Sequence, residues 1–405
     1  MQLPVHSPLT WRGLGAGLQA VLGSPSPSFK RVRETLLTVY GSRAVHLTDS
    51  GTTALRLALH GAPPPVAALP AYGCYDIATA MDGAGGEFLL YDLDPATLGP
   101  DLGSLERTLE AGARRIVVAH LYGVPVDLRA VQAIADRYDA LIVEDAAQGA
   151  GGRFEGKPLG AWGAYGILSF GRGKGVTAGR GGALLANTEE AAARSTELAA
   201  HLRPAHTRMG EVGAAVAQWL MARPMLYGLP ASLPFLGLGE TRYRPVDVPG
   251  SLSAFAAGVL AEAFRSGVAS EEAARRRHNA ARLLLVAARA SQVQQVRPPF
   301  GSEPGYLRLP LRLGQSRSEV DWRAARRLGI MPGYPRALAD LAAFGERRRN
   351  RDTGFPAARL LAETLVTLPT HSRLNAADLA ALEGWLRFPT GQPDGSGTVV
   401  TIRGG

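Results

Sequence analysis

Short continuous runs of apolar residues recur along the first half of the chain. Such runs are typical of strands that are buried on both faces, and they lie at 44–47, 66–69, 87–92, 115–120, 141–145, 165–168 and 183–187. Several segments between them carry apolar residues at every third or fourth position, which predicts helices, at 29–40, 54–60, 128–138 and 189–201. Because strand and helix alternate, we expect an α/β fold in which helices cover both faces of a large, mostly parallel sheet.

The same signals become weaker toward the carboxyl end. There we expect a strand at 306–311 and helices at 319–329 and 375–386. Residues 1–30 are rich in proline, glycine and serine and indicate an N-terminal arm with at most one short helix. Because 405 residues exceed one typical domain, we predict a large domain with the arm over 1–240 and a smaller C-terminal domain over 241–405.

Charge and composition narrow the classes of partner. The formal net charge is +9, and arginine supplies most of it, because lysine occurs only at Lys30, Lys157 and Lys174. A positive balance favours acidic partners such as nucleotide diphosphates, anionic lipid or nucleic acid. We see no helix-turn-helix, zinc or aromatic RNA-binding motif and expect no nucleic-acid partner. The arginine clusters at 275–277 and 347–349 are expected on solvated helix faces.

Cysteine use and hydropathy bear on the compartment. Cys74 is the single cysteine, so we expect neither an intramolecular disulfide nor a cysteine-built zinc site, and we predict no metal centre. The first residues lack the pattern of a signal peptide, and no run of eighteen apolar residues predicts a membrane span. A cytoplasmic location is the resulting expectation.

Candidate chemistry is concentrated between residues 141 and 182. The first apolar run there ends in Glu144 and Asp145, and the second leads into Ser169, with Lys174 five residues further along in a glycine-rich loop. Pyridoxal phosphate needs such a set: the lysine binds the cofactor covalently, the aspartate keeps the pyridine nitrogen protonated, and the serine binds phosphate. Of the three lysines, only Lys174 follows an apolar strand in a glycine loop.

A second candidate lies where the first strand turns into a helix. Ser50, Gly51 and Thr52 join these elements, and a turn of this kind aims free backbone N–H groups at one point, which suits a phosphate. Ser50 has the alternative role of a helix N-cap. With Lys174 downstream, we assign Gly51 and Thr52 to phosphate binding.

Together these motifs resemble those of the DegT/DnrJ/EryC1/StrS aminotransferases, pyridoxal-phosphate enzymes that aminate keto-sugars on nucleotide carriers. The matching motifs are S-G-T-x-A-L at 50–55, H-L-Y-G-x-P-x-D at 120–127, E-D-A-A-Q at 144–148, S-F, lysine and the double glycine within 169–182, and L-P-x-H at 368–371. The match is good over 45–187 and thin elsewhere.

The resemblance implies a fold-type I enzyme, with an α+β small domain, that works as a homodimer. It implies transfer of an amino group from an amino-acid donor such as glutamate to a keto-sugar, in cell-surface polysaccharide or secondary-metabolite biosynthesis. Lys174 and Asp145 are the implied catalytic residues, and Gln148 is expected to lie against the cofactor ring. Related dehydratases carry histidine at the lysine position, so Lys174 favours amino transfer. A non-catalytic regulator or scaffold that retains the fold is the alternative.

Two further roles stay open. The family places a stacking aromatic ring at a position that falls on Cys74 here; we assign the role to Tyr75, with Tyr72 as the alternative and a core role open for both. His120 is either a contact of the substrate or cofactor or, as is more usual at a strand end, a structural residue.

This chain departs from the family pattern around the lysine loop. Arg180 replaces the family's glutamate, Gly171-Arg172 replaces its histidine-proline pair, and the asparagine-tyrosine-arginine segment has only 241–245 as a counterpart. Arg172 and Arg180 could grip a phosphate or carboxylate of an unusual acceptor.

Residues 211–240 resemble the family least. They are apolar, rich in proline and bordered by arginine, so they could form a weak contact with a membrane surface. Burial against a partner subunit or the small domain is the interpretation that we favour, because proteins rarely expose large apolar patches.

Overall fold

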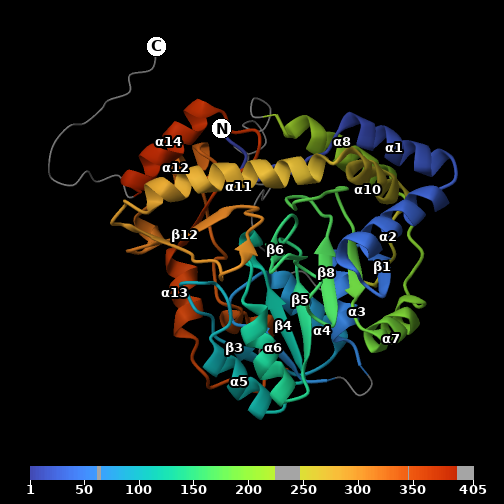
Figure 1. Ribbon diagram of the computed structural model, residues 1–405, viewed down its shortest axis with the longest axis horizontal. Coiled ribbons are helices and arrows are strands. Elements are labelled where there is room, and N and C mark those ends of the chain that lie inside the picture. The colour runs from blue at the N-terminus through green and yellow to red at the C-terminus, as the bar shows by residue number, and fades with distance from the viewer. Residues whose placement is uncertain (62–64, 224–246, 345, 390–405) are drawn as a thin grey trace.

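The computed structural model describes residues 1–61, 65–223, 247–344 and 346–389 (Figure 1). Its centre is a seven-stranded sheet in the order β1-β9-β8-β5-β4-β2-β3. The strands are β1 (Ala44–Thr48), β2 (Ala67–Pro70), β3 (Phe88–Tyr91), β4 (Arg115–Ala119), β5 (Leu141–Asp145), β8 (Tyr165–Ser169) and β9 (Gly182–Ala186). Only β9 runs against its neighbours, so the predicted mostly parallel sheet is confirmed.

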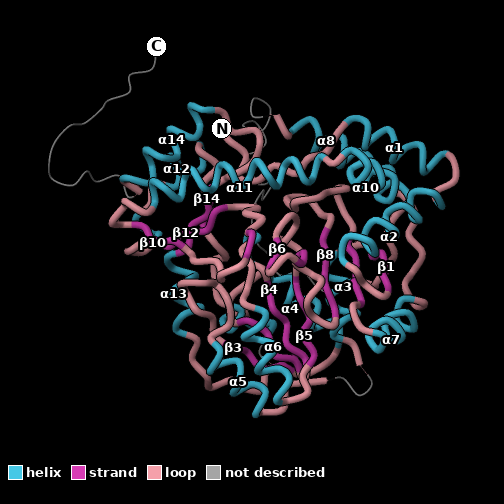
Figure 2. The backbone as a smooth tube through the Cα atoms, viewed as in Figure 1, coloured by secondary structure: helices cyan, strands magenta, loops and turns pink. Residues whose placement is uncertain are grey.

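Helices enclose this sheet on both sides, as Figure 2 shows. They are α1 (Trp11–Leu22), α2 (Ser26–Tyr40), α3 (Gly51–Leu59), α4 (Tyr75–Ala84), α5 (Leu102–Glu110), α6 (Leu128–Arg137), α7 (Glu189–Ala199), α8 (Met209–Met221) and α10 (Ala254–Ser266). Successive strand residues enter different cores: Ile116 packs in the core with α5 and α6, and Val117 in the core with α3 and α4. Both strand faces are therefore buried, which is why the apolar runs are continuous.

A smaller antiparallel sheet forms in the second half of the chain. Its order is β10-β12-β14-β13, with β10 (Val293–Gln295), β12 (Leu309–Leu313), β13 (Met331–Pro332) and β14 (Leu365–Leu368). The accompanying helices are α11 (Val268–Ala287), α12 (Trp322–Arg327), α13 (Pro356–Thr364) and α14 (Ala376–Arg387). Helix α11 crosses the top of Figure 1 and links this sheet to α10.

Short elements complete the described chain. A three-stranded sheet combines β6 (Arg153–Phe154), β7 (Lys157–Pro158) and β11 (Ser302–Glu303). Single 3-10 turns lie at Leu121–Gly123, Arg317–Glu319, Leu338–Asp340 and Ala342–Phe344. Helix α10 packs on α1 and α2, so the helical layer of the large sheet includes it. The division into domains over 1–240 and 241–405 stays a proposal.

The N-terminal arm is more helical than the sequence predicted. Both α1 and the start of α2 lie within the first 30 residues. Thr10 caps α1 by accepting a hydrogen bond from the Gly13 amide at 3.0 Å, and a proline lies in the first turn of α2. Proline is well tolerated there because its missing N–H would have no intrahelical partner. These residues therefore start a helix where we expected a loop.

Two elements of the smaller sheet region also differ from expectation. The strand predicted at 306–311 begins instead at Leu309. Tyr306 has a φ of +40°, which an extended strand does not allow. Helix α12 is shorter than predicted because a separate 3-10 turn precedes it and Gly329, with φ +78°, follows it.

One arginine in each predicted surface cluster is buried, so that prediction is wrong in part. Arg276 is 1% exposed: its Nη2 donates to the His6 carbonyl at 2.7 Å, and its Nε lies 3.4 Å from Glu272 Oε1. Arg348 is 8% exposed and donates to the main-chain oxygens of Ala339, Asn350, Arg351 and Thr353. The guanidinium carries five donors and so satisfies several buried carbonyls at once.

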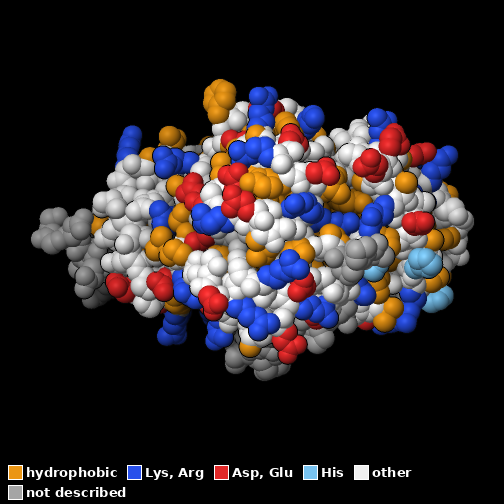
Figure 3. All heavy atoms as spheres, turned by 90° about the horizontal axis from the view of Figure 1, so that it is seen from below, with side chains coloured by type: hydrophobic (Ala, Val, Ile, Leu, Met, Phe, Trp, Pro, Cys, Tyr) orange, Lys and Arg blue, Asp and Glu red, His pale blue; other side chains and the backbone are white. Residues whose placement is uncertain are grey.

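Surface features bear on the remaining expectations. On the face that Figure 3 shows, basic and acidic side chains are interspersed and do not gather into one basic patch. None of the helices in the described ranges combines the length and apolar content needed to cross a bilayer. Of the segment 211–240, the part beyond residue 223 lies outside the described residues. The described part belongs to α8, where Val216 and Leu220 are exposed and Ala215 is buried.

Candidate active site

A cavity of about 660 Å³ lies where β4, β5 and β8 end and where α3 and α4 begin. The carboxyl ends of parallel strands share this edge of the sheet, which is where such folds collect functional groups. The structure brings all the predicted site residues to the wall of this cavity: Gly51, Thr52, Tyr75, Asp145, Gln148, Ser169 and Lys174.

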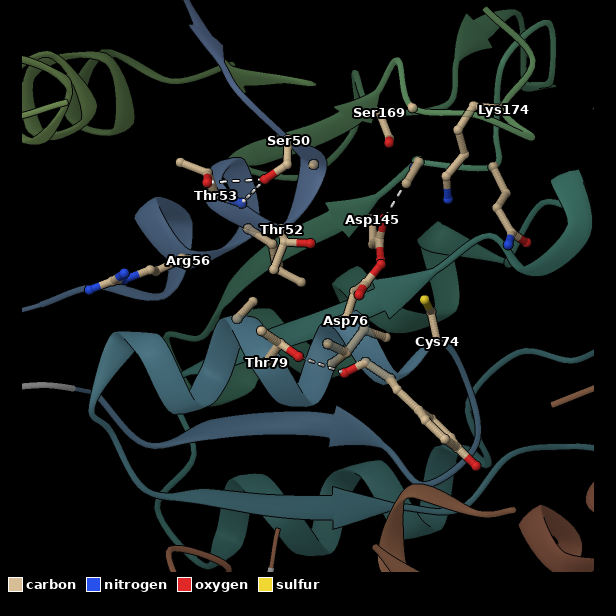
Figure 4. Close-up of a pocket in the computed structure, with 18 of the residues that line it drawn as sticks. Ser50, Thr52, Thr53, Arg56, Cys74, Asp76, Thr79, Asp145, Ser169 and Lys174 are labelled. Carbon is tan, nitrogen blue, oxygen red and sulfur yellow. Dashed lines mark hydrogen bonds between the residues drawn. The ribbon is translucent and has the colours of Figure 1, made fainter. Parts of the chain in front are cut away.

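The start of α3 supplies one wall. Ser50 turns back on the helix and accepts a hydrogen bond from the Thr53 amide at 3.1 Å (Figure 4). Ser50 therefore caps the helix, in line with its alternative interpretation. Thr52 has no side-chain partner among the residues that the structure describes, and the first amide groups of a helix have no intrahelical acceptor. This wall thus offers donors to a ligand.

Ser169 lies against the same point from the end of β8. A Cβ added to Gly51 would come within 2.9 Å of the Ser169 Cβ, so only glycine allows this approach. The Ser169 hydroxyl also lacks a hydrogen-bond partner within the described ranges. A phosphate placed here would meet helix amides and two unengaged hydroxyls, those of Thr52 and Ser169.

Asp145 and Lys174 extend into the same space from different elements (Figure 4). Asp145 ends β5, and its Oδ1 accepts a hydrogen bond from the Ala147 amide at 3.1 Å. Burial raises the pKa of Asp145, while Lys174 and the Ala147 amide oppose that rise. A carboxylate destabilised in this way favours a cationic partner, and a protonated pyridine nitrogen would be one.

Gln148 is held in place by aromatic residues. Its Oε1 accepts a hydrogen bond from the Tyr122 amide at 2.5 Å, and its Nε2 donates to the Tyr334 hydroxyl at 2.9 Å. Tyr334 stacks on Tyr122 at 5.8 Å between ring centroids and meets Tyr72 edge-on at 5.7 Å. Tyr334 also lines the cavity. Sequence reasoning missed it because it comes from the loop after β13, where the family match is thin.

The position expected to hold a stacking ring is occupied by Cys74. Burial raises the pKa of Cys74 to about 12, and the charges of Lys174 and Asp145 both act on this thiol. Tyr75 is 5% exposed, and its hydroxyl is influenced by Arg336 from the second half of the chain. Cys74 and Tyr75 both line the cavity, and the stacking role of Tyr75 stays a prediction. Tyr72 is fully buried in the core.

His120 lines the cavity and forms a buried pair with Glu144. The amide of Val126 donates to His120 Nδ1 at 3.2 Å, so the proton of a neutral ring lies on Nε2, which is 2.8 Å from Glu144 Oε1. Glu144 also accepts from the amides of Gly160 and Trp162 at 2.6 and 2.8 Å. Both ring nitrogens of His120 are engaged, which favours its structural role. Within the described ranges, no three side chains of metal-binding type lie together.

Comparisons with known proteins agree with this geometry. The model of the DegT/DnrJ/EryC1/StrS aminotransferase family matches residues 22–383. An L-glutamine:2-deoxy-scyllo-inosose aminotransferase of Micromonospora echinospora is 34% identical over 181 residues, which are 43% of this chain and 43% of that protein. A GDP-perosamine synthase of Caulobacter vibrioides is 32% identical over 149 residues, 36% of this chain and 40% of that protein. The chain thus matches less than half the length of these relatives.

Solved structures extend the likeness over almost the whole chain. A sugar aminotransferase from Micromonospora echinospora has a TM-score of 0.73 at 23% identity and covers 96% of this chain and 99% of that one. A DegT DnrJ EryC1 StrS aminotransferase from Brucella abortus has a TM-score of 0.69 at 22% identity and covers 94% and 96%. At this identity the likeness establishes the fold, and the predicted fold-type I architecture is confirmed.

Proposed function

The chain belongs to the DegT/DnrJ/EryC1/StrS aminotransferase family, and from this premise we propose that it transfers an amino group from an amino acid to the carbonyl carbon of a keto-sugar. The proposed donor is L-glutamate or L-glutamine, because relatives are named for glutamine. The proposed acceptor is nucleotide-linked, as the name of the GDP-perosamine relative suggests. Cell-surface polysaccharide or secondary-metabolite biosynthesis is the proposed setting.

The observation that carries this proposal is that one cavity is lined by Lys174, Asp145 and the unengaged hydroxyls of Thr52 and Ser169. Enzymes of this family use pyridoxal phosphate, and these residues fit it. The α3 amides with Thr52 and Ser169 would hold the phosphate, Asp145 would pair with the pyridine nitrogen, and Gln148 would lie against the ring. When bound, the cofactor draws electrons away from the substrate carbon, which is the chemistry that amino transfer needs.

The catalytic steps of the protein's own groups follow from this placement. Lys174 would hold the cofactor, and its Nζ amine, when free, would serve as a base beside the substrate carbon. This amine would accept the proton that leaves the substrate carbon. The Asp145 carboxylate would pair with the pyridine nitrogen and favour its protonated form, which would stabilise negative charge that develops during proton transfer.

A homodimer is the proposed working unit. Sites of this fold are usually completed across a twofold interface, which buries a large apolar area. The exposed Val216 and Leu220 of α8 lie on the helix whose Ala215 and Gln218 approach Gly179 at the cavity. A solution mass showing an active monomer would contradict the dimer.

The proposed activity can be tested in two halves. The purified protein, loaded with pyridoxal phosphate, should lose its visible absorption band when L-glutamate or L-glutamine is added, because the cofactor takes up the amino group. Adding a nucleotide-linked keto-sugar should restore the band and give a product whose mass shows a carbonyl oxygen replaced by an amine. A loaded protein that no amino donor converts would reject the proposal and favour the non-catalytic alternative.

A further inference from the structure

The loop between β8 and β9 carries an excess of positive charge. Residues 170–181 include Arg172, Lys174 and Arg180 and contain no acidic residue. All three side chains line the cavity. The proposed chemistry uses Lys174 and leaves the two arginines without a role.

The base of this loop places the two arginines next to each other. Gly171 and Gly179 pair in an isolated β-bridge, and Arg172 and Arg180 each follow one of these glycines directly. The fully buried Thr177 fixes the bridge, because its hydroxyl lies 3.2 Å from the Phe170 carbonyl and 3.1 Å from that of Gly171. The Gly179 amide donates to the same hydroxyl at 2.9 Å. Both arginines thus leave the backbone from adjoining points of a pinned loop.

Most of their hydrogen-bonding capacity is unengaged. Arg172 is exposed and has no hydrogen bond or ion pair with any residue in the described ranges. The Nη2 of Arg180 lies 3.9 Å from Asp49 Oδ2, a distant contact. The other oxygen of Asp49 already accepts from the Thr53 hydroxyl at 2.6 Å. Each guanidinium has five N–H donors, so the pair retains ample capacity for a ligand.

Arg56, a third arginine in the cavity, is hydrogen-bonded to the protein. Arg56 donates from Nη1 to the main-chain oxygen of Asp247 at 3.1 Å. The acidic groups that share the cavity are Asp49, Asp76, Asp145 and Asp247. None of these four belongs to the loop, and of the two loop arginines only Arg180 has an acidic neighbour among the described residues, Asp49 at 3.9 Å.

We propose that Arg172 and Arg180 form a binding subsite for an oxyanion, a phosphate or carboxylate group, of a substrate that enters the cavity; this rests on the proposed aminotransferase function. The planar guanidinium matches both groups with paired hydrogen bonds. The phosphate of the cofactor has donors of its own at the start of α3 and at Ser169. The subsite therefore serves a second anion, which is either a phosphate of the acceptor or a carboxylate of the amino donor.

Inorganic pyrophosphate is a suitable probe for the subsite itself. Calorimetric titration of the cofactor-loaded protein would compare the wild type with the double variant Arg172→Gln and Arg180→Gln. We expect the Kd to rise at least about tenfold, because charge-assisted hydrogen bonds are roughly twice as strong as neutral ones. The charge-retaining pair Arg172→Lys and Arg180→Lys should recover part of the affinity.

A matched control is Arg323→Gln, since Arg323 is an exposed arginine of α12 outside the cavity lining. Its Kd for pyrophosphate should equal that of the wild type. An unchanged Kd in the double glutamine variant would overturn the proposal. Loss of the visible cofactor band in that variant would also overturn it, because the arginines would then hold the cofactor's own phosphate.

Kinetics of the donor and acceptor half-reactions show which substrate carries the anion that binds the subsite. A KM for L-glutamate that rises at least about tenfold in the double glutamine variant would assign the subsite to the donor carboxylate. An unchanged donor half-reaction, with pyrophosphate competing against the acceptor, would assign it to an acceptor phosphate. A wild-type protein that transfers no amino group would reject the proposed function, whereas the pyrophosphate titration would still report on the subsite.

Discussion

The cavity and a buried polar cluster at α11, made of Glu272, Arg276, His371 and Ser372, differ in how far their polar side chains are hydrogen-bonded within the protein. In the cluster, Glu272 accepts hydrogen bonds from the Ser372 amide at 3.1 Å and from its hydroxyl, and Arg276 spans from Glu272 to the His6 carbonyl. His371 Nε2 lies 2.8 Å from the Leu3 carbonyl. In the cavity, by contrast, the hydroxyls of Thr52 and Ser169 and the guanidinium group of Arg172 have no hydrogen-bond partner among the described residues. Engaged polar groups therefore mark the cluster as structural, and unengaged ones mark the cavity as a binding site.

The largest expected effect concerns Lys174. In Lys174→Ala, borohydride should no longer attach the cofactor covalently, and turnover should fall by at least roughly 10²–10⁴-fold, the usual contribution of one proton-transfer group. Circular dichroism should show an intact fold. The measurement is a mass map of the reduced protein together with half-reaction kinetics.

The other two lysines provide the controls. Lys30 lies 3.8 Å from Glu34 on the surface of α2, and Lys157 lies 4.6 Å from the ring centroid of Trp162. Lys30→Ala and Lys157→Ala should therefore retain the covalent adduct. An adduct on Lys30 or Lys157 in the wild type would mean that the cavity has been assigned the wrong lysine.

The next effect tests the structural cluster. Arg276→Ala leaves Glu272 buried without its cation, which should cost about 3–5 kcal/mol of unfolding free energy. The matched control is the exposed neighbour Arg275→Ala, expected within about 0.5 kcal/mol of the wild type. Denaturant unfolding measures both. Equal values for the two variants would show that the buried pair adds nothing to stability.

These two regions also show what a single sequence can predict. The cavity motifs were found because each is local: an apolar strand, its polar end and a glycine turn lie within a few residues of one another. Arg276 was misplaced because its burial depends on His6 and on the crossing of α11, and neither leaves a pattern near residue 276. Tyr334 was missed for the same reason, since it joins Gln148 from a distant loop.

The residues around Cys74 show the role of adjacency in the sequence. The sequence placed an aromatic residue beside the cofactor by adjacency, and Tyr75 was chosen. Cys74 is the extended N-cap residue of α4, and Tyr75 is the first residue of the helix. Both residues line the cavity, so the stacking role of Tyr75 stays a prediction.

Acid should weaken the cluster. Burial lowers the pKa of His371 from 6.5 to about 4. Between pH 6.5 and 4 the histidine binds a proton in the unfolded chain but not in the folded one. The free energy of unfolding therefore decreases as the pH falls from 6.5 to 4. At pH 4 the loss from this residue is roughly 3 kcal/mol. His371→Gln should flatten that slope in denaturant unfolding; an unchanged slope would assign the acid response elsewhere.

Asp145→Asn should lower activity and raise stability. The amide cannot hold the pyridine nitrogen protonated, and losing a charge-assisted hydrogen bond costs roughly 1.5–3 kcal/mol, so the donor half-reaction should slow by about ten- to 150-fold. Single-turnover absorbance measures it. A near-normal rate would remove Asp145 from the mechanism.

The stability of the same variant without cofactor has a defined pH dependence. Burial raises the pKa of Asp145 above its ordinary value of 3.8. Ionised Asp145 therefore lowers the free energy of unfolding at pH values above this raised pKa. The effect disappears below pH 3.8, where Asp145 is protonated in both the folded and the unfolded protein. The cofactor-free variant should be more stable than the wild type at pH 7 and equal to it below pH 3.8. Lower stability at pH 7 would contradict a destabilised carboxylate.

The smallest effect separates two serines at the same wall. Ser50 caps α3 through the Thr53 amide, so Ser50→Ala should cost about 1 kcal/mol of unfolding free energy and leave cofactor affinity nearly unchanged. Ser169 has no partner in the described part of the chain, so Ser169→Ala should leave stability unchanged within about 0.5 kcal/mol. Its cofactor affinity should fall by about tenfold, because a hydrogen bond to a charged phosphate is lost. Denaturant unfolding and cofactor titration of both variants give four values. If both variants lost unfolding free energy and cofactor affinity to the same extent, hydrogen bonding within the protein would not distinguish a structural side chain from a binding one.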